Sequence, residues 1–239
     1  MSTPSYNKHD KAFVYFDIGN TLMEGPPQSP WSSLVSKLEL NSDVVEDIQS
    51  YILTHNISCM QVLVEYLSAS HPHINRDLIN TSVMEVWDSQ IRGPSRINGS
   101  TDLLRKLNSR DIDYGFISNI WHPYAETFLL LYSNSMGHTY RPKVFSHVYG
   151  IAKPDSSLYA IALSLSGSNP ENTIMVGDSY INDIFPAMKV GMKTVWVLNN
   201  PRKEKVYIDS VKNQYLLPPS LIVNSINEIT PESLLELIP

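Results

Sequence analysis

The alternation of strand-like and helix-like segments after residue 100 constrains the fold of this chain most. Short apolar runs at 111–119, 142–150, 172–178 and 192–200 are predicted strands, and the amphipathic stretches between them, 100–110, 123–135, 154–167 and 181–191, are predicted helices. Strands that are joined through helices form a parallel sheet with right-handed crossovers. With the aromatic and β-branched run Phe13–Phe16, this pattern predicts about five parallel strands in an α/β, Rossmann-like core.

The segment between the first strand and the rest of this core has a different pattern. From about Trp31 to Gln90 the apolar residues recur at helical spacing, for example over 41–55, 58–70 and 75–89. The Pro-rich "EGPPQSPW" precedes this stretch and "IRGPSRING" follows it, and both are typical of linkers. We therefore expect a core of residues 1–24 and 97–239 with an all-helical domain, residues 25–96, inserted into it. The tail "TPESLLELIP" is predicted to be a closing helix that Thr230 caps.

Composition excludes several classes of function. The chain has 239 residues and a net charge of -6, and no Lys/Arg-rich patch stands out, which argues against nucleic-acid binding. A single cysteine excludes an internal disulfide. No apolar run is long enough for a membrane span, and the polar start "MSTPSYNKHDK" lacks the apolar core of a signal peptide. We expect a cytoplasmic protein, and the sequence does not indicate its oligomeric state.

Polar and charged residues stand where several predicted strands end. Asp17 follows the first strand, Ser118 and Asn119 end the second, and Asp178 ends the fourth. Lys153 lies just before the helix that follows the third strand, and Asp183 lies in the first turn of the helix after Asp178. Ligands of an open parallel sheet bind at the carboxyl ends of its strands, so these side chains are expected to meet there.

This set of groups suits phosphoryl transfer. Carboxylates and a backbone carbonyl are the hard oxygen ligands that Mg²⁺ prefers. Ser118, with backbone N–H groups near it, could hold phosphoryl oxygens, and Lys153 could stabilise the charge that develops on the transferring group. Asp17 would then attack phosphorus and form an aspartyl-phosphate, which water hydrolyses. Each residue alone is as easily a turn or surface residue, and the argument rests on their joint occurrence.

The segments "FDIGNTL", "FISN", "KPDSS" and "GDSYIND" resemble, in order and spacing, the four motifs of the haloacid dehalogenase superfamily. The resemblance covers roughly residues 12–24 and 97–200, and the helical insertion stands where that family carries a helical cap domain. It implies that Asp17 is the nucleophile and a metal ligand, together with the backbone carbonyl of Gly19. It further implies a small phosphorylated metabolite as substrate, phosphate binding by Ser118 and Lys153, and Mg²⁺ binding by Asp178 and by Asp183, either directly or next to the ligands. Asn119, beside Ser118, is a further candidate for substrate binding.

Gly19 departs from the family's pattern. The phosphatases of this family usually carry a second aspartate two residues after the nucleophile, which protonates the leaving oxygen and later activates water. A glycine keeps the carbonyl but cannot transfer a proton. Three hypotheses follow: substrates whose leaving group needs little protonation, a surrogate acid such as Glu24 or His122, or a protein that binds phosphorylated ligands and turns over slowly or not at all. Because dehalogenase members also lack this aspartate, a dehalogenase is a distant third function, after the phosphatase and the slow phospho-ligand binder.

Overall fold

The computed structural model describes residues 11–137 and 141–239. Residues 1–10, on which the expectation of no signal peptide rests, lie outside the described residues. Within the part that the structure describes, no helix has both the length and the apolar character that crossing a membrane requires.

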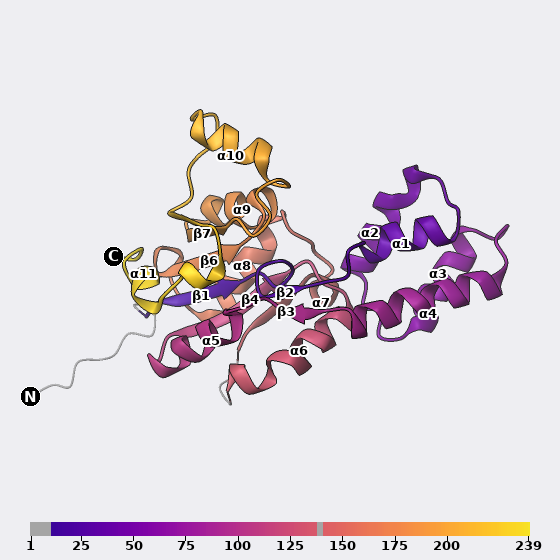
Figure 1. Ribbon diagram of the computed structural model, residues 1–239, viewed down its shortest axis with the longest axis horizontal. Helices are drawn as coiled ribbons and strands as arrows, with labels where there is room; N and C mark the ends of the chain where they lie inside the picture. The colour runs from indigo at the N-terminus through magenta and orange to yellow at the C-terminus, as the bar shows by residue number, and fades with distance from the viewer. Residues whose placement is uncertain (1–10, 138–140) are drawn as a thin grey trace, which may run out of the picture.

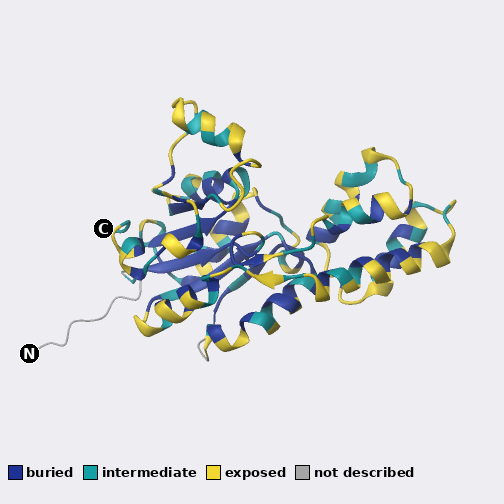
Figure 2. Cartoon of the chain, in the orientation of Figure 1, coloured by how far each residue is buried: buried dark blue, intermediate teal, exposed yellow. Residues whose placement is uncertain are grey.

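The core is a six-stranded sheet in which every neighbouring pair is parallel, as the alternating pattern predicts (Figure 1). The strand order is β5-β4-β1-β6-β7-β8. β1 is therefore internal, between β4 and β6, and its four residues are all buried (Figure 2). The strands are β1 (Phe13–Phe16), β4 (Asp113–Ser118), β5 (Lys143–Phe145), β6 (Thr173–Gly177), β7 (Lys193–Val197) and β8 (Leu221–Val223).

Successive side chains of β1 point to opposite faces of the sheet, which separates two apolar clusters. Val14 and Phe16 pack in a cluster with α5 (Ser100–Ser109), α6 (His122–Met136) and α11 (Pro231–Leu235). Phe13 and Tyr15 pack on the other face with α8 (Ser156–Ser166) and α9 (Phe185–Lys189). Burial on both faces explains why the strand is a continuous apolar run instead of an alternating one.

The residues between β1 and the rest of the core form four helices around an apolar cluster, which Trp121 of the core also joins (Figures 1 and 2). A two-stranded antiparallel pair stands at the base of this insertion, where β2 (Met23–Glu24) pairs with β3 (Ser95–Arg96). The predicted domain boundaries at 24/25 and 96/97 fall on these strands, and they stay a prediction. The helices are α1 (Pro30–Lys37), α2 (Val45–Thr54), α3 (Met60–Ser70) and α4 (Arg76–Arg92).

Three segments differ from the sequence-based expectation. The predicted strand 142–150 is a strand only to Phe145, and α7 (Ser146–Tyr149) follows it and ends at Gly150, whose φ is 68°. The predicted helix 181–191 begins with a π-helical turn, Tyr180–Ile184, before α9. The sheet has one strand more than expected, the three-residue β8. The helix α10 (Lys205–Lys212) precedes this strand. The predicted closing helix is present as α11, with Thr230 in a capping box.

Candidate active site

Asp17, Ser118 and Lys153 meet at the carboxyl end of the sheet. The backbone N–H of Asp17 donates to the carbonyl of Val176 in β6 at 2.9 Å, which fixes the residue beyond the internal strand β1. Oδ1 of Asp17 accepts hydrogen bonds from Ser118 Oγ at 3.1 Å and from Lys153 Nζ at 2.6 Å. All three residues are 5% exposed or less. The sequence prediction that strand ends bring these groups together is therefore met for this trio.

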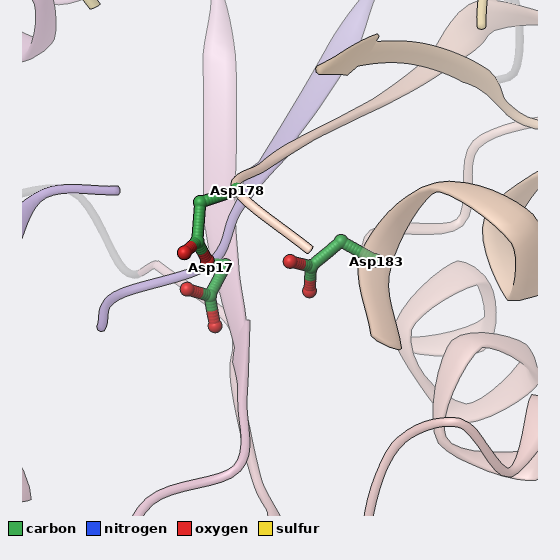
Figure 3. Close-up of side chains that lie close together, drawn as sticks. All are labelled: Asp17, Asp178 and Asp183. Carbon is green, nitrogen blue, oxygen red and sulfur yellow. The ribbon is translucent and has the colours of Figure 1, made fainter. Parts of the chain in front are cut away.

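Asp178 and Asp183 complete a cluster of three carboxylates with Asp17 (Figure 3). Each offers an oxygen that lies within 4.8 Å of the others. Both oxygens of Asp183 are engaged, Oδ1 with Lys153 Nζ at 2.6 Å and Oδ2 with the N–H of Ser179 at 3.0 Å. Asp178 is 8% exposed, and its carboxylate accepts no hydrogen bond from a described residue. An unpaired buried carboxylate is costly unless a cation binds it.

Gly177 allows the third carboxylate to approach. A Cβ at this position would lie 2.4 Å from Cβ and Cγ of Asp183, far inside van der Waals contact. The glycine at the end of β6 therefore creates the space in which the Asp183 side chain lies against the strand. This is the physical reason for a glycine directly before Asp178 in "GDSYIND".

Electrostatics within the cluster favour a bound cation. Burial, together with the charges of Asp17 and Asp183, raises the pKa of Asp178 well above its usual range. Burial also raises the pKa of Asp183 to about 6, although Lys153 opposes the shift. Burial alone would lower the pKa of Lys153, but the two carboxylates that it contacts raise it overall. Lys153 is therefore charged at neutral pH, and it neutralises only part of the cluster. The donor set fits a hard divalent cation such as Mg²⁺.

Asn119 has a contact that the sequence did not predict. Its side chain donates from Nδ2 to the carbonyl of Lys153 at 2.9 Å and accepts from the N–H of Lys153 at 2.7 Å. The amide therefore holds the backbone of the loop that carries the lysine. Sequence analysis places Asn119 in substrate binding, whereas these two bonds also make it a positioning residue for Lys153. Ser118 differs from Asn119 in this respect, because the Ser118 hydroxyl contacts Asp17 directly.

Gly19 lies at the rim of the cluster in ordinary backbone conformation. Its φ lies outside the left-handed region, which Asn20 adopts instead with φ of 56°. A Cβ built on Gly19 meets no atom within 4 Å. No described group donates a hydrogen bond to its carbonyl oxygen, so the carbonyl is available as a ligand. The missing side chain is thus not required by the local backbone or by crowding.

A cleft of about 480 Å³ extends from this rim. The core contributes Gly19 and Asn119, and α4 of the inserted helices contributes Gln90. Trp121, which directly precedes α6, and Tyr124, in the first turn of α6, also line it. The hydroxyl of Tyr124 donates to the carbonyl of Met23 at 3.1 Å, and burial, followed by the charges of Asp17 and Asp178, raises its pKa. The cleft therefore opens beside the cluster: Gly19 is two residues from Asp17 and Asn119 adjoins Ser118, whereas the three carboxylates are not among its lining residues.

The two surrogate acids suggested by the sequence lie elsewhere. His122 pairs with Glu126, with Nε2 3.2 Å from Oε1, and its ring lies near that of Trp87. Glu24 is exposed on β2. Neither belongs to the described residues that line the cleft. Sequence reasoning also missed Gln90, Tyr124 and Lys203, which line the cleft but belong to no motif.

Residues 31–197 match the family model of haloacid dehalogenase-like hydrolases. Among curated relatives, a glyceraldehyde 3-phosphate phosphatase of Pyrococcus abyssi is 38% identical over 197 residues, which are 77% of this chain and 79% of that protein. Two further relatives match over shorter segments, about a quarter of the length of each. The glyceraldehyde 3-phosphate phosphatase of Pyrococcus furiosus is 44% identical over 22% of this chain and 24% of that protein. The phosphoserine phosphatase of Thermus thermophilus is 36% identical over 29% and 28%.

Solved structures share the fold over almost the whole chain. A 2-haloacid dehalogenase from Pseudomonas syringae has a TM-score of 0.63 at 18% identity and covers 95% of this chain and 98% of its own. A family hydrolase from Deinococcus radiodurans, solved with phosphate and sodium, has a TM-score of 0.56 at 21% identity over 96% and 97%. A magnesium complex of a family enzyme from Bacteroides thetaiotaomicron has a TM-score of 0.59 at 14% identity over 83% and 98%. At such identities the likeness concerns the fold.

Proposed function

The chain belongs to the family of haloacid dehalogenase-like hydrolases, and from that premise we propose that it is a Mg²⁺-dependent phosphatase of small phosphomonoesters that forms an aspartyl-phosphate on Asp17. The named activities of the relatives support phosphatase chemistry, since three of them are called phosphatases. The dehalogenase name belongs to three structural neighbours at 18–20% identity, which support the fold and no particular reaction.

The observation that carries the proposal is the buried Asp17 carboxylate between two donors and two further carboxylates. Ser118 and Lys153 both bind Oδ1 of Asp17, so a phosphoryl group that approaches Asp17 meets a hydroxyl and an ammonium at once. These donors can bind its oxygens and stabilise the charge of the transition state. A structural ion pair would need the lysine, but it would not need an unpaired Asp178 beside it.

Asp17, Asp178 and the carbonyl of Gly19 are the groups that would hold the metal ion. Asp183, whose two oxygens are already bonded, would act beside them by orienting Lys153. When bound, Mg²⁺ would offset the charge of the carboxylates and of the phosphate, which lets an anionic nucleophile approach an anionic substrate. Magnesium in a structural neighbour is consistent with this assignment.

The residues of the chain perform the remaining steps. An oxygen of Asp17 attacks phosphorus, and the bond between phosphorus and the leaving oxygen breaks. Because Gly19 has no acidic group, the leaving oxygen takes its proton from solvent or departs as an anion. Water then attacks phosphorus of the aspartyl-phosphate, inorganic phosphate leaves, and the Asp17 carboxylate is restored. Lys153 stays bound to the carboxylate cluster and offsets charge in both steps.

A second candidate function follows from Gly19 alone. General acid–base catalysis contributes about 10²–10⁴-fold to such reactions, and a protein without the acid could serve to bind a phosphorylated ligand. In this case the cluster would bind phosphate with metal but release product very slowly. The two candidates share a ligand class and differ in turnover.

Phosphate release from 4-nitrophenyl phosphate tests the proposal. We expect release with Mg²⁺, no release after chelation with EDTA, and recovery when Mg²⁺ is added back. Asp17→Asn keeps the size of the side chain but removes the attacking oxygen, so it should abolish release while the circular dichroism spectrum stays unchanged. Release by a pure Asp17→Asn variant at more than a few per cent of the wild type would contradict the role of Asp17. Metal-dependent binding of phosphate without turnover would favour the ligand-binding candidate.

A further inference from the structure

Gln90 lines the cleft, and the NH₂ group of its side-chain amide has no hydrogen-bond partner among the described residues. The residue lies near the end of α4 and is only 3% exposed. Its Oε1 accepts a hydrogen bond from the indole Nε1 of Trp121 at 3.2 Å. An indole N–H can only donate, so this bond fixes which end of the amide is oxygen and turns the NH₂ group the other way. No described residue accepts a hydrogen bond from that NH₂ group. The NH₂ group is not among the buried polar atoms that lack a partner, so it is open to solvent and free to donate to an acceptor that enters the cleft.

Lys203 contributes the charge on the same cleft. Of the described residues that line it, Lys203 alone carries a charged side chain, and its ammonium makes no ion pair within the described part of the chain. Lys203 is an exposed residue, so a solvated surface lysine is the alternative interpretation.

Two anchors hold the Lys203 loop against the active site, and they weaken that alternative. Asn199 Nδ2 donates to the carbonyl of Asn20 at 2.7 Å, beside Gly19. Glu204, which is 6% exposed, accepts a hydrogen bond at Oε2 from the N–H of Tyr180 at 2.8 Å, in the turn that follows Asp178. The loop is therefore bonded to both loops that carry the carboxylate cluster, and these bonds hold the backbone of Lys203 beside the cleft.

We propose that Gln90 and Lys203 form a specificity subsite that binds a carboxylate on the leaving group of the substrate. The subsite extends the proposed phosphatase function and rests on it. A neutral two-hydrogen donor and a single ammonium match one planar monoanion, whereas a second phosphate would bring two charges to one cation. Because one donor comes from the inserted helices and the other from the core, a bound carboxylate would also connect the two walls of the cleft.

Two aryl phosphates that differ by one group test this subsite. 4-Carboxyphenyl phosphate carries the carboxylate, and 4-carbamoylphenyl phosphate is its neutral isostere with the same size. For the wild-type protein we expect kcat/KM to be about tenfold higher for the carboxylate, because hydrogen bonds to charged groups are worth at least a tenfold change in binding. A 1,4-phenylene bisphosphate distinguishes a general preference for anions, since it should be a poorer substrate than the carboxylate.

Three variants give the proposal its controls. Lys203→Gln removes the charge, and Gln90→Glu keeps an acceptor for Trp121 while it replaces the free NH₂ group with an anionic oxygen. Each should lower the carboxylate-to-carboxamide ratio of kcat/KM about tenfold. Lys205→Gln changes a neighbouring exposed lysine that does not line the cleft and should leave the ratio unchanged. Thermal melting checks whether Gln90→Glu is folded. If it is not, Lys203→Gln, at an exposed position, tests the subsite alone.

The outcomes separate the subsite from the proposed function. A wild-type ratio near one, or a ratio that neither substitution changes, overturns the subsite even if phosphate is released from both compounds. If the wild-type protein hydrolyses neither compound, the phosphatase proposal fails. Calorimetric dissociation constants of the same two compounds then decide the subsite, which requires tighter binding of the carboxylate and its loss in Lys203→Gln.

Discussion

Lys153 and Asp17 form a buried ion pair in which Nζ lies 2.6 Å from Oδ1 and the side chains are 3% and 7% exposed. The same ammonium lies 2.6 Å from Oδ1 of Asp183. One lysine thus joins the carboxylate after β1 to the carboxylate in the turn after β6. Because two carboxylates share one cation and a third, Asp178, has no partner among the described residues, the cluster is organised for a further positive charge and an incoming anion.

Removing this lysine should affect both activity and stability. Lys153→Met keeps most of the apolar stem of the side chain but leaves buried carboxylates without their cation. We expect phosphate release to fall by about 10²–10³-fold, the usual loss for one preorganised group that stabilises transition-state charge. The free energy of unfolding should fall by about 3–5 kcal/mol, as it does when one partner of a buried ion pair is removed. Urea denaturation and steady-state kinetics measure the two effects. Lys106→Met, at an exposed position on α5, is the control, and a Lys153→Met variant with nearly normal kcat would contradict the assignment.

Asn119 should act through Lys153. If its main role is to hold the lysine backbone, Asn119→Ala lowers kcat in the wild type but has little further effect in the Lys153→Met background. The double-mutant cycle on kcat/KM therefore gives a coupling energy close to the whole effect of Asn119→Ala. Additive losses would instead support direct contact of Asn119 with the substrate, which is the role inferred from sequence.

The stability of the metal-free protein should depend on the protonation of Asp183. Burial raises its pKa in the folded state to about 6, above the value of 3.8 that applies to the unfolded chain. The folded state then binds the proton more tightly, so stability falls as pH rises through the window between these two values and increases on acidification through it. We expect urea denaturation in EDTA to show a larger gain from about pH 7 to about pH 5 for the wild type than for Asp183→Asn. Saturating Mg²⁺, which favours the ionised carboxylates, should reduce this difference. Parallel pH profiles of the two proteins without metal would refute the assignment.

The sequence predicts those parts of the fold that a local pattern encodes. β1 is buried on both faces and reads as an unbroken apolar run, and Thr230 with Pro231 marks the start of α11. The segment 142–150 is predicted as one strand because its apolar residues continue from β5 into the short helix α7. Over so few residues, periodicity alone does not separate a strand from a helix. β8 escaped prediction because three residues of strand, only one of them buried, carry almost no periodic signal.

The residues of the candidate site likewise include some that a sequence pattern predicts and others that only the packing brings together. Asp17, Ser118, Lys153, Asp178 and Asp183 stand at strand ends or helix starts, and the topology of a parallel sheet brings such positions together. Gln90 and Lys203 are separated by more than a hundred residues and belong to no motif, and only the packing of α4 against the loop before α6 places one of them on the cleft. The bond from Asn119 to Lys153 likewise depends on the course of a loop that no sequence pattern fixes.

Gly19 provides the most direct test of how the missing acid shapes the reaction. Alkoxides are poor leaving groups that need a proton in the transition state, whereas phenolates and acylates need less. The wild-type protein should therefore favour aryl, acyl or anomeric phosphates over simple alkyl phosphates. Gly19→Asp should raise the rate on alkyl phosphates by up to about 10²–10⁴-fold and the rate on aryl phosphates by less.

The local structure makes this substitution informative. Residue 19 does not have positive φ, and a Cβ there meets no atom within 4 Å, so a side chain can begin at this position without backbone strain or a clash at its Cβ. Gly19→Asn has a similar size and cannot transfer a proton, so it separates the acid from the added side chain. Rates on ethyl phosphate and on phenyl phosphate are measured for the wild type and both variants, with Mg²⁺ saturating. A folded, metal-binding Gly19→Asp variant that gains equally on both substrates, gains nothing, or behaves as Gly19→Asn does would count against the missing-acid account. The phospho-ligand-binding role would then be the better explanation of "FDIGNTL".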